Sequence, residues 1–181
     1  EAGPLGFRPL TGLHRQFPAG DAAPMHRLKT RPQFQAAMAG GTVSRTAHFA
    51  LHRLGLPPVA TDGVPPATGP DSSPQAQGSQ ALFLVGGQAG GVWLGAMVPK
   101  RWARRAVTRN TIKRQIYAVA SGFEARMPSG AHVVRLRMGF DRKQFVSATS
   151  EALKQAVRAE LEQLFAAAER RSRAAATGAR P

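Results

Sequence analysis

Residues 100–114 form a strongly basic segment that holds seven Lys or Arg residues and no Asp or Glu. No acidic residue occurs between Asp71 and Glu124, and the whole chain has a formal net charge of +15. A surface that serves only solubility mixes both signs of charge, whereas this segment carries one sign. Any fold of this chain is therefore expected to present the segment to a polyanion, with nucleic acid as the leading candidate.

An anionic membrane surface is the second candidate partner. Helices that lie on membranes combine a basic face with an aromatic and apolar face, and the sequence shows no long helix of this kind. It also contains no apolar run long enough to span a bilayer. We therefore expect no membrane partner.

Length and composition indicate one folded domain with low-complexity segments attached to it. The 181 residues suffice for a domain with a hydrophobic core, and the 19 Gly and 14 Pro are clustered. We expect a single RNA-binding domain over 25–170, a disordered extension over 1–24 and a disordered tail over 171–181. Met25 directly precedes the predicted structure and is a candidate initiator.

Residues 57–80 interrupt the domain with a segment that contains six Pro and three Gly. A structureless loop of this length is unusual inside a compact domain. Because the entropy of loop closure grows only slowly with length, we interpret the segment as an insertion that the fold tolerates.

Hydrophobic periodicity predicts an α+β fold in which three helices pack on a small four-stranded sheet. A capping box pattern at Thr30 and Gln33 predicts a helix over 31–39, which ends at Gly40. The other predicted elements are strands at 48–54, 81–85 and 92–98, a helix at 103–121, a strand at 132–138 and a helix at 145–170. The glycine-rich loop 86–91 is expected to join its two flanking strands as a hairpin. The predicted order is therefore α-β-β-β-α-β-α.

Apolar stripes predict which faces of these elements are buried. The stripe of the last helix comprises Leu153, Val157, Leu161, Leu164 and Phe165. The stripe of the helix at 103–121 and the residues just after it comprises Ile112, Ile116, Val119 and Phe123. In the strand at 48–54, alternation places Phe49 and Leu51 on one face and Ala50 and His52 on the other.

The cations of the basic segment would destabilise an isolated helix. Arg101, Arg105, Arg109 and Lys113 are four residues apart, so they form one helical stripe and repel one another. The cations at the start of the helix also oppose the helix dipole, which favours positive charge at the C-terminal end. Each such interaction costs roughly a few tenths of a kcal/mol. A phosphate backbone beside the stripe would make both effects favourable, so the helix is the predicted nucleic-acid contact.

The same segment resembles the bacterial ribonuclease P protein component. That family has a strand that ends in two basic residues, followed by a basic helix with an Arg-Asn-Arg signature and then Ile/Val-Lys-Arg. The signature here reads Arg109-Asn110-Thr111, so its third cation is lost and only the contacts of the first two residues carry over. The resemblance covers roughly 26–56 and 81–168, including the order of elements.

The resemblance implies an enzyme that removes the 5′ leader of precursor tRNA, in which a large RNA subunit carries the catalysis with Mg²⁺. The protein would supply no catalytic or metal-binding residue, and its β-α-β crossover would have the rare left-handed form. The residues expected to contact the ribonuclease P RNA are Lys100, Arg101, Arg104, Arg105, Arg109, Asn110, Lys113 and Arg114. The residues expected to line a cleft for the single-stranded leader are Phe34, Met38, Phe49 and His52.

Two cleft positions depart from the family pattern. Met38 stands where the helix usually has a second aromatic residue, and His52 stands where the strand usually has Tyr. Since stacking of a base on an aromatic ring contributes about 1–3 kcal/mol, leader contacts here would be weaker or differently shaped. Phe34 could equally be a plain core residue, and His52 could be a surface residue without a ligand.

The expected partners are the ribonuclease P RNA and precursor tRNA, without an obligate protein partner, and the expected location is the cytoplasm. The absence of cysteine is compatible with a reducing compartment.

Two other functions stay open. A stand-alone nuclease would need clustered carboxylates or His and Asp sets for its metal ions, whereas the five His residues are scattered and Asp141 is isolated. A non-catalytic RNA-binding protein of ribosomal or RNA-chaperone type has a similar composition. Only the basic motif within this order of elements separates it from the ribonuclease P protein.

Overall fold

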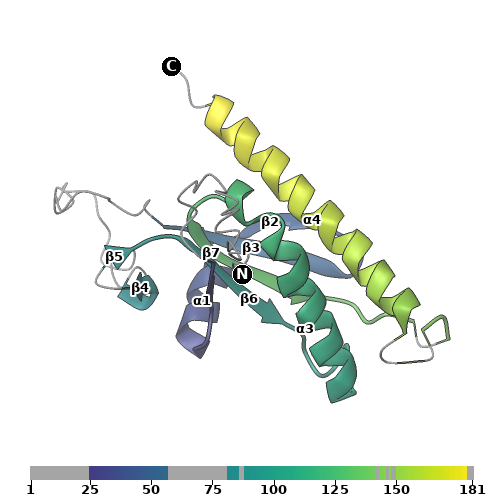
Figure 1. Ribbon diagram of the computed structural model, residues 1–181. Helices are drawn as coiled ribbons and strands as arrows, with labels where there is room; N and C mark the ends of the chain where they lie inside the picture. The colour runs from purple at the N-terminus through teal and green to yellow at the C-terminus, as the bar shows by residue number, and fades with distance from the viewer. Residues whose placement is uncertain are drawn as a thin grey trace, which may run out of the picture.

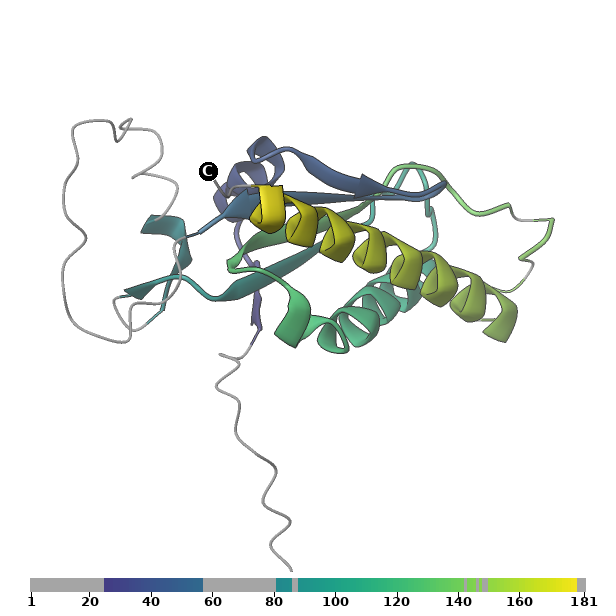
Figure 2. The same ribbon diagram turned by 90° about the horizontal axis from the view of Figure 1, so that it is seen from above.

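The structure is a computed structural model, and it describes residues 25–56, 81–85, 88–141, 143–145, 147 and 150–178. The predicted extension over 1–24 and the predicted insertion over 57–80 lie outside the described residues. The described part of the chain contains a central sheet with helices on both faces (Figures 1 and 2).

The central sheet has five strands and is mixed. Its strands are β1 (His26–Arg27), β2 (Thr42–Arg45), β3 (Phe49–Gly55), β6 (Val92–Met97) and β7 (Gly130–Leu136). Their spatial order is β1-β6-β7-β3-β2, in which β6 pairs in parallel with both β1 and β7. The β3 strand pairs antiparallel with β7 and β2. The predicted α+β class is confirmed, whereas the predicted count of four strands is wrong.

Three α-helices and several short elements complete the described fold. The helices are α1 (Arg31–Ala39), α3 (Ala106–Ser121) and α4 (Glu151–Gly178), with 3₁₀ turns η1 (Ala81–Phe83) and η2 (Glu124–Arg126). A separate two-stranded ladder joins β4 (Leu84–Val85) to β5 (Gln88–Ala89). The α3 helix connects the parallel strands β6 and β7, as the sequence predicted; the left-handed form of this crossover stays a prediction.

The first helix follows the sequence closely. It spans the predicted residues, and the Gln33 Oε1 atom accepts hydrogen bonds from the backbone N–H groups of Thr30 at 3.1 Å and Lys29 at 2.9 Å. Two of the N–H groups that precede the helix are therefore satisfied by a side chain within it.

The predicted strand at 81–85 is confirmed only for residues 84–85, and its predicted hairpin with the strand at 92–98 is wrong. Residues 81–83 form a 3₁₀ turn that buries Phe83 completely, with its ring 5.5 Å from the ring of Trp93 in an edge-on arrangement. The apolar residue Phe83 is thus buried although its segment does not join the central sheet. The hairpin lies within residues 84–89, and β6 takes β1 and β7 as its neighbours.

The helix boundaries also differ from the predicted ones. The α3 helix begins at Ala106 instead of residue 103, and α4 begins at Glu151 instead of residue 145. Because α4 continues to Gly178, the prediction of a disordered tail is wrong for residues 171–178. The strands β1 and β2 were not predicted.

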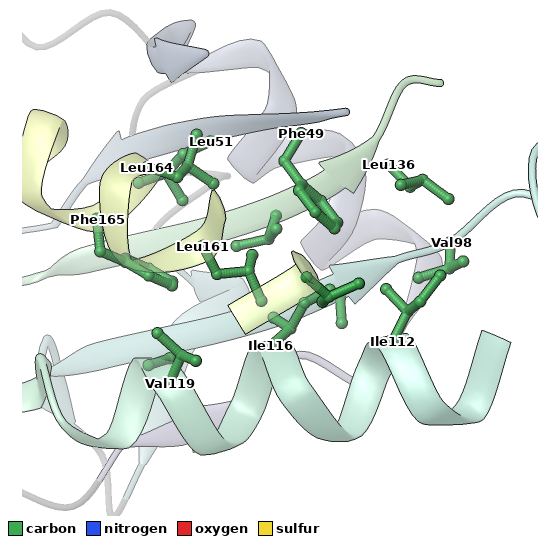
Figure 3. Packing of buried hydrophobic residues seen from close by; sticks show 14 of the residues in the cluster. Phe49, Leu51, Val98, Ile112, Ile116, Val119, Leu136, Leu161, Leu164 and Phe165 are labelled. Carbon is green, nitrogen blue, oxygen red and sulfur yellow. The ribbon is translucent and has the colours of Figure 1, made fainter. Parts of the chain in front are cut away.

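Two hydrophobic clusters lie on opposite faces of the sheet. The larger one joins alternate residues of β3, β6 and β7 to α3 and α4, which lie side by side in both views of the fold (Figures 1 and 2). All five residues of the predicted α4 stripe are buried in it, and Figure 3 shows Leu161, Leu164 and Phe165 above Ile116 and Val119 of α3. The smaller cluster packs α1 and Phe83 against the other face.

The end of α1 approaches β3 so closely that only glycine fits at residue 40. A Cβ atom on Gly40 would lie 2.3 Å from the carbonyl oxygen of Arg53 and 2.6 Å from the Cα atom of Leu54. Both are backbone atoms and cannot move aside as a flexible side chain could. The glycine therefore sets the distance between α1 and the sheet.

We predict that Gly40→Ala lowers the free energy of unfolding by about 1–3 kcal/mol, because the added methyl group forces α1 away from β3. Gly55→Ala is the matched control, since no atom lies within 4 Å of its added Cβ and its effect should stay within about 0.5 kcal/mol. Urea unfolding of both variants checks this. Equal losses of stability would contradict the close approach at Gly40.

His132 is a buried titratable residue on the α3 and α4 face of the sheet. Its side chain is 2% exposed, and its Nδ1 atom lies 3.1 Å from the carbonyl oxygen of Gly130. Burial, together with the nearby charge of Arg53, lowers the pKa of His132 to about 4, although backbone hydrogen bonds oppose this shift. The histidine is therefore neutral in the folded protein at neutral pH.

This depressed pKa predicts a loss of stability on mild acidification. Below pH 6.5 the unfolded chain binds a proton at His132 that the folded protein does not bind until about pH 4, so stability falls across this window. Between pH 7 and pH 5 the loss should be about 2 kcal/mol. His132→Gln should remove about this much of the difference between urea unfolding curves at the two pH values. A variant that keeps the full pH dependence would show that another group is responsible.

Candidate nucleic-acid interface

The first half of the basic segment forms a turn that precedes α3. The Pro99 carbonyl oxygen accepts hydrogen bonds from the N–H groups of Trp102 at 3.1 Å and Ala103 at 3.2 Å, and Ala103 is buried. The cations Lys100, Arg101, Arg104 and Arg105 are exposed on this turn. The prediction that Arg101 and Arg105 continue a helical stripe is therefore wrong: Arg105 caps the start of α3, and Arg101 lies on the turn before it.

Arg109 ties this turn to α3. Its Nη1 atom donates hydrogen bonds to the carbonyl oxygens of Ala103 at 3.1 Å and Arg104 at 2.7 Å, and the residue is half-buried. Arg109 therefore positions the neighbouring cations as well as being one of them.

The helix α3 separates apolar and polar residues onto opposite faces. Ile112 and Ile116 are buried in the larger cluster, where Figure 3 shows them on the side of the helix that faces the sheet. Asn110 and Arg114 are exposed, and Lys113 is half-buried. Since these polar positions alternate with the buried ones at helical spacing, the core side chains fix the direction in which the cations point.

The cations of 100–114 form no ion pair within the described part of the chain. The ion pairs found there are Arg126–Glu169, Lys154–Glu151 and Arg173–Glu169, and the His48 Nδ1 atom lies 2.8 Å from the Glu160 carboxylate. Every acidic residue in these contacts lies on α4. The partners outside α4 are Arg126 in η2 and His48 beside β3. No acidic side chain of the described residues therefore forms an ion pair with the basic segment.

An open groove of about 700 Å³ continues this surface between α3 and β1. It is lined by Met25, Arg27, Asn110, Lys113, Arg114, Tyr117, Ala118, Ser121 and Glu124. The Arg27 guanidinium lies 4.3 Å from the centre of the Tyr117 ring, which is the only tyrosine of the chain. This pair was not predicted from the sequence, because its two residues are far apart in the chain. Tyr117 follows Lys113 by four residues on α3, and this helical spacing was the signal that both side chains lie on the same face of the helix.

A second surface lies on the opposite face of the sheet, beside α1. Phe34 and Met38 of α1 are half-buried against the smaller cluster, and a Cβ atom on Gly95 would lie 2.5 Å from the Phe34 ring. His52 of β3 is half-buried, and its Nδ1 atom lies 3.4 Å from the Thr42 hydroxyl. Phe34 is thus partly a core residue, with the rest of its ring exposed.

Burial is the largest cause that lowers the pKa of His52, followed by the charges of Arg135 and Arg45. Arg135 lies on β7 opposite Ala50 and Met97, so alternation places it on the same face as Val133 and α1. Its Nε atom is buried and has no hydrogen-bond partner among the described residues. Arg135 was not predicted as a site residue. Its position between the buried Val134 and Leu136 was the signal in the sequence, because a charged residue between two buried ones lies on the other face of the strand.

Phe49 does not belong to this second surface. Its side chain is completely buried in the larger cluster, on the face covered by α3 and α4. The prediction that Phe49 lines a cleft together with Phe34 is therefore wrong. The alternation of β3 had already placed Phe49 and His52 on opposite faces, and the structure agrees with that alternation.

No group of three or more His, Cys, Asp or Glu side chains in the described ranges could hold a metal ion. Among the helices of the described residues, none combines the length and apolar character that crossing a membrane requires.

Comparisons with known proteins find ribonuclease P proteins similar to this chain. The chain is 29% identical to the ribonuclease P protein component of Bordetella petrii over 150 residues, which cover 83% of this chain and 97% of that protein. It is 39% identical to the ribonuclease P protein component of Bordetella parapertussis over 72 residues, 40% of this chain and 54% of that protein. A solved structure of the Staphylococcus aureus RNase P protein matches with a TM-score of 0.48 and 15% identity, over 78% of this chain and 93% of that one.

The family description Ribonuclease P matches residues 23–168, which include both surfaces described above and every strand of the central sheet. Since this match spans well over half of the sequence, the chain belongs to the ribonuclease P protein family.

Proposed function

We propose that this chain is the protein subunit of a ribonuclease P, which binds the catalytic RNA and supports removal of the 5′ leader from precursor tRNA. The observation that carries the proposal is the unpaired basic surface of residues 100–114, within a chain that matches the family over residues 23–168. The partners would be the ribonuclease P RNA and precursor tRNA, in the cytoplasm.

The basic turn and the outer face of α3 would bind the RNA subunit. An RNA backbone is a dense line of negative charge, and each contacted phosphate releases condensed counterions. The exposed cations at residues 100, 101, 104, 105 and 114 suit this contact, while Asn110 and Lys113 lie in the adjoining groove. Because Ile112 and Ile116 hold α3 against the sheet, the surface is present before RNA binds.

The face beside α1 would bind the single-stranded leader. Phe34 supplies a partly exposed ring, Met38 an adaptable apolar side chain, and Arg135 a charge that can meet a phosphate. His52 would take part as a neutral ring at neutral pH, because burial and the neighbouring arginines lower its pKa. Phe49 is not included, since it is completely buried on the other face.

The reaction would use Mg²⁺ bound mainly by the RNA subunit. The carboxylates of the described residues lie mostly on α4, where they pair with cations, and do not gather into a metal site. The protein would therefore contribute binding and positioning, and no side chain of it is assigned to bond cleavage.

Reconstitution tests the proposed function. The full-length protein should increase the rate at which a bacterial ribonuclease P RNA removes the leader of precursor tRNA at low Mg²⁺, and the protein alone should cleave nothing. Cleavage is followed on end-labelled precursor. A rate unchanged by the protein would favour an RNA-binding protein of ribosomal or chaperone type, and cleavage without the RNA subunit would favour a stand-alone nuclease.

We predict that Arg114→Gln weakens binding to the RNA subunit and makes log K less steep in log salt concentration by about one unit, because one phosphate contact is lost. Arg114 is the cleanest choice because it is exposed and, unlike Arg109, holds no loop carbonyl. Binding is measured by titration over a range of KCl concentrations.

Arg173→Gln is the matched control for this measurement. Arg173 pairs with Glu169 near the C-terminal end of α4, at the opposite end of the molecule from the start of α3 (Figure 1). Its salt slope should equal that of the unchanged protein. If both variants changed the slope equally, the RNA would be responding to net charge and not to the surface of α3.

A further inference from the structure

Trp102 is an exposed aromatic residue in the middle of the basic turn. It is 38% exposed, whereas Trp93, the other tryptophan of the chain, is only 7% exposed and donates its indole N–H to the Gly90 carbonyl oxygen at 3.0 Å. Tryptophan is normally well buried, because its large apolar surface gains most from leaving water. Within the part of the chain that the structure describes, the Trp102 side chain is therefore open to a partner.

The backbone that carries Trp102 is held from three sides. Its N–H group bonds to the Pro99 carbonyl oxygen at 3.1 Å, and the next residue, Ala103, is buried in the larger cluster. A Cβ atom on Gly139 would lie 2.7 Å from the Trp102 carbonyl oxygen, so the chain after β7 packs directly on the turn. Arg109 bonds to the two carbonyl groups that follow. The indole is thus presented from a fixed backbone.

The charged residues that flank Trp102 in the basic turn are all positive. The Arg101 guanidinium lies over the indole, 5.5 Å from the ring centre, and exposed cations flank the ring at residues 100, 104 and 105. An aromatic ring beside a line of cations is the arrangement by which proteins bind unpaired nucleotides, since bases stack on the ring while the cations meet the phosphates. A duplex offers its phosphates but keeps its bases stacked inside.

We propose that Trp102 is a stacking platform for an unpaired nucleobase of the ribonuclease P ribonucleoprotein. The base would lie on the indole, and the neighbouring arginines would bind the phosphates on either side of it. This proposal rests on the proposed function, and it adds a contact that depends on shape and stacking to a surface otherwise explained by charge.

Tryptophan fluorescence tests the proposal directly in the full-length protein. Titration with the ribonuclease P RNA alone and with precursor tRNA alone should quench the emission in at least one arm, and that arm identifies the source of the base. Trp102→Phe should lose the quenching, because the remaining Trp93 is buried. A fully paired RNA duplex should leave the emission unchanged. Quenching that persists in Trp102→Phe, or that a duplex produces equally, would overturn the proposal.

Affinity provides a second measurement. Trp102→Ala should weaken binding of the RNA that quenches by about 5- to 100-fold, and Trp102→Phe should recover most of the loss. The salt slope should not change, since no charge is removed. Leu84→Ala is the matched control, because it trims a 50% exposed apolar side chain outside residues 100–114 without removing a ring, and its affinity should be unchanged.

The two proposals fail in different ways. If the protein neither binds nor activates the RNA subunit, the proposed function fails. If it does both, but Trp102→Ala binds as tightly as the unchanged protein and its emission is insensitive to RNA, only the stacking platform fails.

Discussion

The burial of Ile112 and Ile116 against the sheet is the interaction on which the basic surface depends. Burying each such side chain contributes about 1.5–3 kcal/mol, whereas each misplaced or repelling cation on a helix costs only about 0.2–1 kcal/mol. The apolar face of α3 therefore outweighs the repulsion on its polar face, and the helix forms without an anion beside it. The cations can therefore stay close together, because burial of the apolar face of α3 offsets their repulsion.

Local signals predicted those parts of the fold that depend on neighbours in the sequence. The reciprocal pattern of Thr30 and Gln33 located α1 correctly, because the hydrogen bonds that start the helix are made within five residues. The apolar stripe of α4 identified five buried residues, since helical spacing alone decides which of them share a face. Alternation likewise assigned Phe49 and His52 to opposite faces of β3, even though the family resemblance suggested one cleft for both.

Long-range contacts account for what the sequence could not show. The two residues of β1 are a strand only because Trp93 and Leu94 pair with them, and two residues carry no periodicity. The apolar sequence of residues 81–83 predicts a strand, but these residues form a 3₁₀ turn in which the Phe83 ring packs against Trp93. The start of α3 was placed too early because the turn that delays it depends on Pro99 and on Arg109, six residues after Ala103.

The strand β6 links the two surfaces. Its alternate residues Trp93 and Met97 face α1, while Leu94, Ala96 and Val98 at its end face α3, and the chain then passes directly into the basic turn. The basic surface and the α1 surface are thus fixed to opposite sides of the same strand. The two hydrophobic clusters lie between them, one on each face of the sheet. A side chain exchanged on one surface need not disturb the other, since no described hydrogen bond or ion pair joins residues 100–114 to Phe34, Met38 or His52. Under the proposed function, this arrangement would hold two RNA segments at a set separation and orientation.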